Sequence, residues 1–283
     1  MVVDFDKLPL NNTIFKSWLT TYHKINSDLY KNIAVYISGG SDSDIIIDLI
    51  MNTTEQHNLH KLKFVFCDVG IEYQATKRHL GYLESKYNIK IITLKPDKSI
   101  GVTKKEFGVP FLSKNVSQNI ERLANKNFDF TTTKNYEELI TTYPKIISAA
   151  QWWSNKKTNA GYSTSMFDIN YNLGLKEFLQ AHPPEFKISS KCCHYLKKVI
   201  GKKFEKENNI DLKITGVRKA EGGLRSKMYT SCFSPDKNGV MDNYRPIFFY
   251  TKQDKEEYNK YYNIKNSDCY TVYGMKRTGC CGC

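Results

Sequence analysis

The stretch IAVYISGGSDSDIIID, residues 33–48, decides the fold of this chain. Residues 33–37 are apolar and mostly β-branched or aromatic, which is typical of a buried strand. Residues 38–43 read Ser-Gly-Gly-Ser-Asp-Ser, and an apolar run at helical spacing follows from Ile45. Serine and aspartate are favoured before the first turn of a helix. The pattern therefore predicts a tight turn from a strand into a helix.

Such a turn is suited to binding phosphate. Adjacent glycines let the backbone approach an anion, and the amino end of the following helix attracts negative charge. No Gly-Lys-Ser/Thr follows, so the turn is not a Walker A loop, and its spacing does not match the GxGxxG dinucleotide motif. The alternative is a Gly/Ser turn that only joins two elements. The predicted phosphate-binding residues are Ser38, Gly39, Gly40, Ser41, Asp42 and Ser43.

Strand-like and helix-like segments alternate outward from this turn. The further predicted strands are residues 62–67, 89–94, 212–217 and 244–249. Residues 10–30, 74–86 and 252–262 have the apolar spacing of helices. Alternation of this kind predicts an α/β fold with a doubly wound, mainly parallel sheet.

Polar residues follow two of these strands where each one ends, and ligands of parallel sheets bind at that edge. Asp68 and Gly70 follow the strand at 62–67, and Asp68 is predicted to bind Mg²⁺ or a ribose hydroxyl; the alternative is a turn cap. Arg218 follows the strand at 212–217, with Arg225 beyond it. Arginine pairs well with phosphate or sulfate. The alternative for Arg218 is a surface ion pair with Glu221.

The middle of the chain has no clear strand and helix rhythm. We predict that residues 96–190 form a helical insertion that covers the active site. It separates residues 1–95, the first half of the nucleotide-binding domain, from residues 191–283, which carry the arginines and a cysteine-bearing C-terminal segment. Trp152 and Trp153 are predicted to pack in a core, the alternative being base stacking next to lysines.

The composition indicates a globular protein whose positive charge favours binding to polyanions. The formal net charge is +13, which favours nucleotides, tRNA or DNA as partners; the alternative is a solvated lysine-rich surface. No run of about 18 apolar residues is present, so no membrane span is expected. The first ten residues lack the features of a signal peptide, so a cytoplasmic location is expected. The sequence does not indicate an oligomeric state.

Four of the eight cysteines form two pairs that suggest a metal centre. Cys192 and Cys193 are adjacent, and Cys280 and Cys283 have CxxC spacing. Four thiolates suit tetrahedral Zn²⁺ or a [4Fe–4S] cluster. Adjacent cysteines seldom bind one zinc ion comfortably, whereas a cluster offers a separate iron to each thiolate. The alternative is a set of buried structural thiols.

Four blocks together resemble the phosphoadenosine phosphosulfate (PAPS) reductase family, which includes adenylyl-sulfate (APS) reductases, within the PP-loop (adenine nucleotide α-hydrolase-like) superfamily. They are residues 38–43, 68–73, 191–225 and 245–283. Val69 stands where the family usually has threonine, and residues 96–185 carry no part of the resemblance. The resemblance implies an adenine nucleotide at the loop, with Arg218 and Arg225 on its distal anion. It also implies a [4Fe–4S] cluster on Cys192, Cys193, Cys280 and Cys283.

One departure bears on the reaction. Reductases of this family take up sulfite on a further cysteine in a C-terminal Glu-Cys-Gly-Leu-His-type tail, whereas this sequence ends at Cys283. We therefore expect an enzyme that activates a substrate with Mg²⁺ and ATP and transfers sulfur to a nucleic acid. The alternatives are an APS or PAPS reductase, and a nucleotide-binding module without catalysis. A sulfur donor or a thioredoxin-like protein is the expected partner, and no catalytic residue is assigned.

Overall fold

The computed structural model describes residues 11–222 and 228–280. The chain divides into two compact units. The first consists of Met1–Asp97 together with Val199–Cys283, and the second is Lys98–Lys198. Each unit is described by itself.

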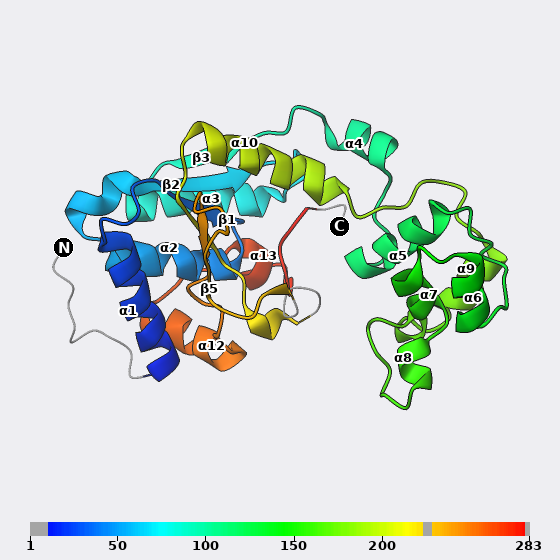
Figure 1. Ribbon diagram of the computed structural model, residues 1–283. Helices are drawn as coiled ribbons and strands as arrows, with labels where there is room; N and C mark the ends of the chain where they lie inside the picture. The colour runs from blue at the N-terminus through cyan, green and yellow to red at the C-terminus, as the bar shows by residue number, and fades with distance from the viewer. Residues whose placement is uncertain (1–10, 223–227, 281–283) are drawn as a thin grey trace. The chain divides into compact units, whose positions relative to one another are not determined.

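The first unit is built on a six-stranded sheet (Figure 1) with the strand order β3-β2-β1-β4-β6-β5. Its strands are β1 (Ile33–Ile37), β2 (Leu62–Cys67), β3 (Ile91–Leu94), β4 (Leu212–Thr215), β5 (Phe233–Ser234) and β6 (Asp242–Tyr244). All neighbouring strands are parallel except β5, which pairs antiparallel with β6. The predicted α/β fold with a mainly parallel sheet is confirmed.

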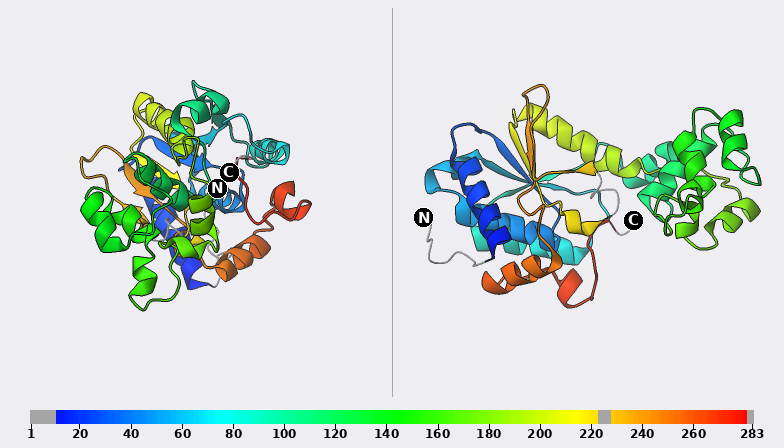
Figure 2. Two further views of the ribbon diagram at one scale, coloured as in Figure 1. Left: turned by 90° about the vertical axis from the view of Figure 1, so that its right-hand side faces the viewer. Right: turned by 60° about the horizontal axis from the view of Figure 1, so that its bottom comes forward.

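Helices cover both faces of this sheet (Figures 1 and 2). The helices of the first unit are α1 (Asn12–Asn26), α2 (Ser41–Thr53), η2 (Gln56–Lys61), α3 (Gln74–Tyr87), α10 (Val199–Glu207), η5 (Lys219–Glu221), α12 (Lys252–Tyr261) and α13 (Asp268–Thr271). Val35 of β1 belongs to the same buried cluster as Ile46 of α2 and Tyr258 of α12. The next residue back, Ala34, packs instead with Phe204 of α10. The alternation follows from the period of two along a strand.

The second unit is helical. Its elements are α4 (Ile100–Phe107), α5 (Lys114–Ala124), α6 (Tyr136–Thr142), α7 (Ile147–Trp153), α8 (Lys156–Asn159), η3 (Ile169–Tyr171), α9 (Leu175–Ala181) and the π-helix η4 (His194–Lys198). Trp152 and Trp153 are buried in its core with Phe128 and Phe130, which confirms their predicted packing role. In the described part of the chain, no helix is both long and apolar enough to cross a membrane.

Three predicted strands differ from the structure. β4 ends at Thr215, two residues earlier than predicted. β3 begins at Ile91, two residues later than predicted. The run at 244–249 is wrong as a strand, because only Tyr244 belongs to β6. Pro246 has no N–H for a strand ladder, and the chain turns there, with Phe248 N–H bonded to Arg245 O at 3.1 Å. Ile247 and Phe248 are nevertheless fully buried, so their apolar character reflects packing of a turn.

Candidate nucleotide-binding site

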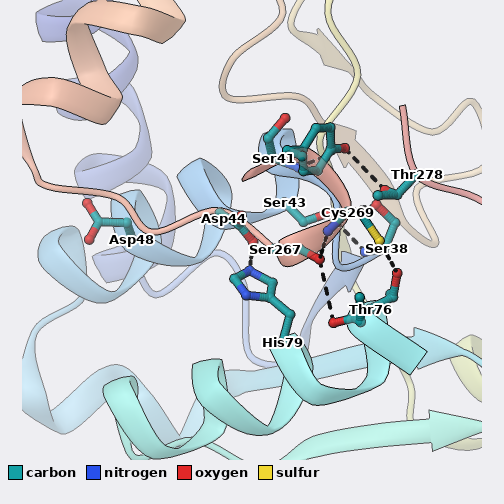
Figure 3. Close-up of polar contacts among 12 residues, drawn as sticks. Ser38, Ser41, Ser43, Asp44, Asp48, Thr76, His79, Ser267, Cys269 and Thr278 are labelled. Carbon is teal, nitrogen blue, oxygen red and sulfur yellow. Dashed lines mark hydrogen bonds and ion pairs between the residues drawn. The ribbon is translucent and has the colours of Figure 1, made fainter. Parts of the chain in front are cut away.

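The glycine loop joins β1 to α2 as predicted. The strand ends at Ile37, Gly40 is the N-cap residue, and the helix begins at Ser41. Ser43 closes the loop, because its Oγ accepts the Ser38 N–H at 2.9 Å and lies 2.9 Å from Ser38 Oγ (Figure 3). The six residues predicted to bind phosphate therefore form one compact turn at the amino end of a helix.

Both glycines of the loop are required by their surroundings. Gly39 has a φ of 65°, in the left-handed region that other residues rarely adopt. A Cβ atom on Gly39 would lie 2.6 Å from Thr76 Cγ2, and one on Gly40 would lie 2.8 Å from Thr278 Oγ1. Both glycines are buried, so a larger residue at either position would displace these side chains.

Two cationic side chains meet at the first turn of α2. Arg218 Nε lies 3.0 Å from Asp42 Oδ1, and Lys255 Nζ lies 2.7 Å from the same oxygen. Lys255 also donates a hydrogen bond to Ser41 Oγ. Arg218 was predicted here from its place after β4, but Lys255 was missed. No local signal distinguishes Lys255, because it lies in a lysine-rich helix 213 residues after Asp42 in the sequence.

Asp68 lies just past the carboxyl end of β2, as predicted. Its Oδ1 accepts the Gly70 N–H at 2.8 Å, and its Oδ2 lies 3.1 Å from Lys77 Nζ. Gly70 adopts a φ of 89°, which favours glycine. Burial by itself would raise the pKa of Asp68, but hydrogen bonds from Gly70 and Glu72 and the ammonium of Lys77 lower it below the ordinary value. Asp68 is therefore an ionised carboxylate, able to bind a metal ion, at the carboxyl end of the sheet strands.

The segment after α12 lies against the glycine loop, which sequence reasoning missed. The Tyr270 hydroxyl accepts the Ser41 N–H at 3.3 Å and lies 3.2 Å from Thr278 Oγ1. Cys280 pairs with Glu72 in an antiparallel bridge, and its thiol donates to Glu72 Oε1 at 3.6 Å. Residues from the end of the described chain therefore line the amino end of α2.

A buried polar pair also lies next to the loop (Figure 3). His79 Nε2 of α3 lies 2.9 Å from Asp44 Oδ1 of α2, and the two side chains are 4% and 1% exposed. Burial raises the pKa of Asp44, and the hydrogen bond with His79 opposes that effect. The pair ties α2 to α3 immediately behind the phosphate loop.

The predicted metal ligands are distributed over both units. Cys192 and Cys193 belong to the second unit and Cys280 to the first. Cys283 and Arg225 lie outside the described residues. A hydrogen bond from Cys192 lowers the pKa of Cys193 to about 5, with help from the ammonium groups of Lys114 and Lys197 and against the effect of burial. Within the described part of each unit, no three His, Cys, Asp or Glu side chains gather as a metal site.

The chain resembles a number of solved structures at low identity, and three of them illustrate the likeness. The phosphoadenylyl-sulfate (PAPS) reductase from Candida auris, in a phosphate complex, is 11% identical, with a TM-score of 0.49 over 94% of this chain and 87% of that chain. The FMN adenylyltransferase from Candida glabrata is 11% identical, with a TM-score of 0.48 over 98% and 67%. An NH3-dependent NAD synthetase from Campylobacter jejuni is 16% identical, with a TM-score of 0.29 over 68% and 93%.

The sequence comparisons locate the resemblance within the chain. No curated protein sequence matches it, but a family model matches residues 32–145. The matched range includes the phosphate loop and Asp68 and extends into the helical unit, where the motifs had indicated no resemblance. It ends before the arginine and cysteine blocks. Residues 32–145 therefore match the phosphoadenosine phosphosulfate reductase domain, a member of the PP-loop superfamily, as the motifs predicted.

Proposed function

We propose that this chain is an enzyme that binds an adenine nucleotide at the loop of residues 38–43 and takes part in sulfur chemistry. The observation that carries the proposal is the turn itself, where two adjacent glycines, the amino end of α2 and the Arg218 guanidinium meet. Backbone N–H groups and a guanidinium are the donors that phosphate oxygens prefer. The family match of this segment supports an adenine nucleotide as the ligand.

The reaction we propose is activation of an acceptor by ATP. An oxygen of the acceptor attacks the α-phosphorus, the bond to the bridging oxygen breaks, and pyrophosphate leaves with the electron pair. The loop holds the leaving pyrophosphate, and Arg218 balances part of its growing charge. Asp68, ionised at neutral pH, suits Mg²⁺ as an oxygen ligand. Bound Mg²⁺ would offset the remaining charge on the phosphates.

The proposed acceptor is a nucleic acid, tRNA or DNA. A net charge of +13 supports a polyanionic partner. After adenylation of a base oxygen, a sulfur donor at the oxidation level of hydrosulfide attacks the base carbon that bears this oxygen. The C–O bond breaks, and AMP leaves with the oxygen.

The cysteines are proposed to serve the sulfur step. Cys192, Cys193, Cys280 and Cys283 together offer four thiolates, a donor set that fits a [4Fe–4S] cluster, with Zn²⁺ as the alternative. The cluster would carry sulfur or stabilise the folded protein.

Sulfonucleotide reduction is the second candidate, and the PAPS reductase domain match favours it. In that reaction a thiolate attacks the sulfur of APS or PAPS, the S–O bond breaks, and the nucleotide leaves. A second thiol, from a thioredoxin-like protein, then releases sulfite and forms a disulfide.

Turnover assays distinguish the candidates. Protein purified without oxygen is incubated with Mg²⁺ and ATP plus bulk tRNA or DNA and sulfide, or with APS or PAPS plus a dithiol. We expect pyrophosphate release from ATP that depends on the nucleic acid. Sulfite release from APS or PAPS would instead establish the reductase. Nucleotide binding with neither product would contradict both reactions.

A further inference from the structure

We propose that Lys255 is a phosphate-binding residue of this site, and that Asp42 holds Lys255 and Arg218 in position until a diphosphate or triphosphate group replaces it. The inference rests on the proposed function, because the ligand is the phosphate chain of the nucleotide bound at the loop. It adds a second cation, and a carboxylate that competes with the ligand.

Lys255 is held rigidly where it meets the loop. The amino end of α12 is fixed by a capping box in which Thr251 and Asp254 exchange hydrogen bonds. One turn along, the fully buried Tyr258 donates its hydroxyl proton to Asp48 of α2 at 2.9 Å. Residues three apart share a helix face, so the anchor of Tyr258 orients Lys255 toward α2. The Lys255 side chain is only 17% exposed.

Another lysine of the same helix provides the contrast. Lys252 is 90% exposed and lies 3.6 Å from Glu256 in an ordinary pair within the helix. Long lysine side chains lose conformational entropy when they are ordered, and exposed pairs contribute little in return. Lys255 is instead ordered at the first turn of α2, where it contacts both Ser41 and Asp42.

The charges at this turn suit an anion. Lys255 and Arg218 converge on the single oxygen Oδ1 of Asp42, so one carboxylate serves two cations. The exposed fractions are 13% for Arg218 and 22% for Asp42. The amino end of α2 adds further positive potential. Charges shielded from water interact more strongly than exposed ones, and a phosphate chain offers several oxygens to the two cations.

Asp42 therefore acts as an internal substitute for the ligand. Its carboxylate lies in the first turn of α2, where an anion is favourable, and it occupies the two cations that would face a phosphate. Binding a phosphate chain exchanges these ion pairs for contacts with the ligand. Neutralising Asp42 should strengthen phosphate binding, and neutralising Lys255 should weaken it.

Calorimetric titration of the full chain with inorganic pyrophosphate, ATP, GTP and AMP, without divalent cations, tests the proposal. Lys255→Met should weaken pyrophosphate and ATP binding about tenfold or more, because a charge-assisted contact is lost, and AMP binding much less. Lys255→Arg should restore most of the affinity. Asp42→Asn should bind pyrophosphate more tightly than the wild type. Lys252→Met, at a side chain that is 90% exposed, is the matched control and should bind as the wild type does.

The outcomes separate this inference from the proposed function. Unchanged pyrophosphate affinity in Lys255→Met, or weaker affinity in Asp42→Asn, would overturn the roles given to these residues while leaving nucleotide binding intact. Pyrophosphate binding that depends on Lys255 in a protein that does not discriminate ATP from GTP would support the cation and contradict the adenine site. A wild type that binds neither pyrophosphate nor ATP would overturn both this inference and the proposed function. If Lys255→Met does not fold, the Lys255→Arg and Asp42→Asn titrations decide.

Discussion

Gly39 shows how closely the phosphate loop depends on one residue. Its φ of 65° disfavours any side chain, and a Cβ atom at this position would lie 2.6 Å from Thr76 Cγ2. An L-residue in the left-handed region costs about 1–2 kcal/mol, and the clash with α3 adds to this cost.

We therefore expect Gly39→Ala to lower the free energy of unfolding by about 2 kcal/mol and to weaken nucleotide binding. Chemical denaturation and calorimetric titration measure the two effects. Gly81→Ala is the matched control, because Gly81 lies inside α3 with no atom within 4 Å of the added carbon. Alanine there should be neutral or stabilising. Equal effects of the two substitutions would contradict the argument.

Cys193 is the residue whose chemistry depends most on its neighbours. Its pKa of about 5 places the thiolate in the majority at neutral pH, whereas an ordinary cysteine is mostly protonated there.

In metal-free protein, the rate of Cys193 alkylation by iodoacetamide should rise as the pH increases through about 5 and should be lost below it, because only the thiolate reacts. Peptide mass spectrometry at a series of pH values measures this rate. Lys114→Met should move the midpoint upward, since the Lys114 ammonium favours the thiolate. The buried Cys269 should stay unlabelled. An alkylation midpoint at about pH 8.5, the ordinary cysteine value, would show that these neighbours do not lower the pKa of Cys193.

At the scale of elements, α13 and the residues after it contact the amino end of α2. Tyr270 of α13 occupies the Ser41 N–H, which is a donor that a phosphate would also use. The hydroxyl and the ligand therefore compete for the amino end of α2.

Tyr270→Phe should increase the affinity for ATP by about two- to tenfold, the range that a net hydrogen bond of about 0.5–1.5 kcal/mol allows. The ring itself is retained, so the thermal midpoint should change little. Tyr273→Phe, at a side chain that is 62% exposed, is the control and should have no effect. Weaker ATP binding in Tyr270→Phe would mean that the hydroxyl contacts the ligand instead of competing with it.

At the scale of the whole molecule, the cysteines raise the question of a metal centre. Cys192 and Cys193 belong to the helical unit and Cys280 to the sheet unit.

We expect the protein to be brown when it is purified without oxygen, with about four iron atoms per chain, as a thiolate-bound [4Fe–4S] cluster requires. Elemental analysis and the visible absorption spectrum measure this. Cys192→Ser and Cys280→Ser should each lose iron, and Cys67→Ser, outside the proposed ligand set, should keep it. A colourless preparation with stoichiometric zinc would replace the cluster with a zinc site.

The parts of the fold that were predictable are those with a local cause. Strand β1 is a continuous apolar run, and β2 is apolar except for Lys63. Helix α12 begins at the Thr251 N-cap with Asp254 in its first turn. The turn at 244–249 was misread as a strand because burial makes both kinds of segment apolar, and only Pro246 in that run opposed a strand.

The candidate site divides in the same way. Residues 33–48 alone specify the turn of strand into helix, because periodicity, capping and the glycine requirement act between neighbours in the chain. The partners of that turn, Lys255 and Tyr270, lie more than two hundred residues away. Their positions follow from the packing of α12 and α13 against α2 and α3, and such long-range packing leaves no trace in local sequence patterns. Sequence therefore identifies the phosphate loop, and tertiary packing selects the side chains that surround it.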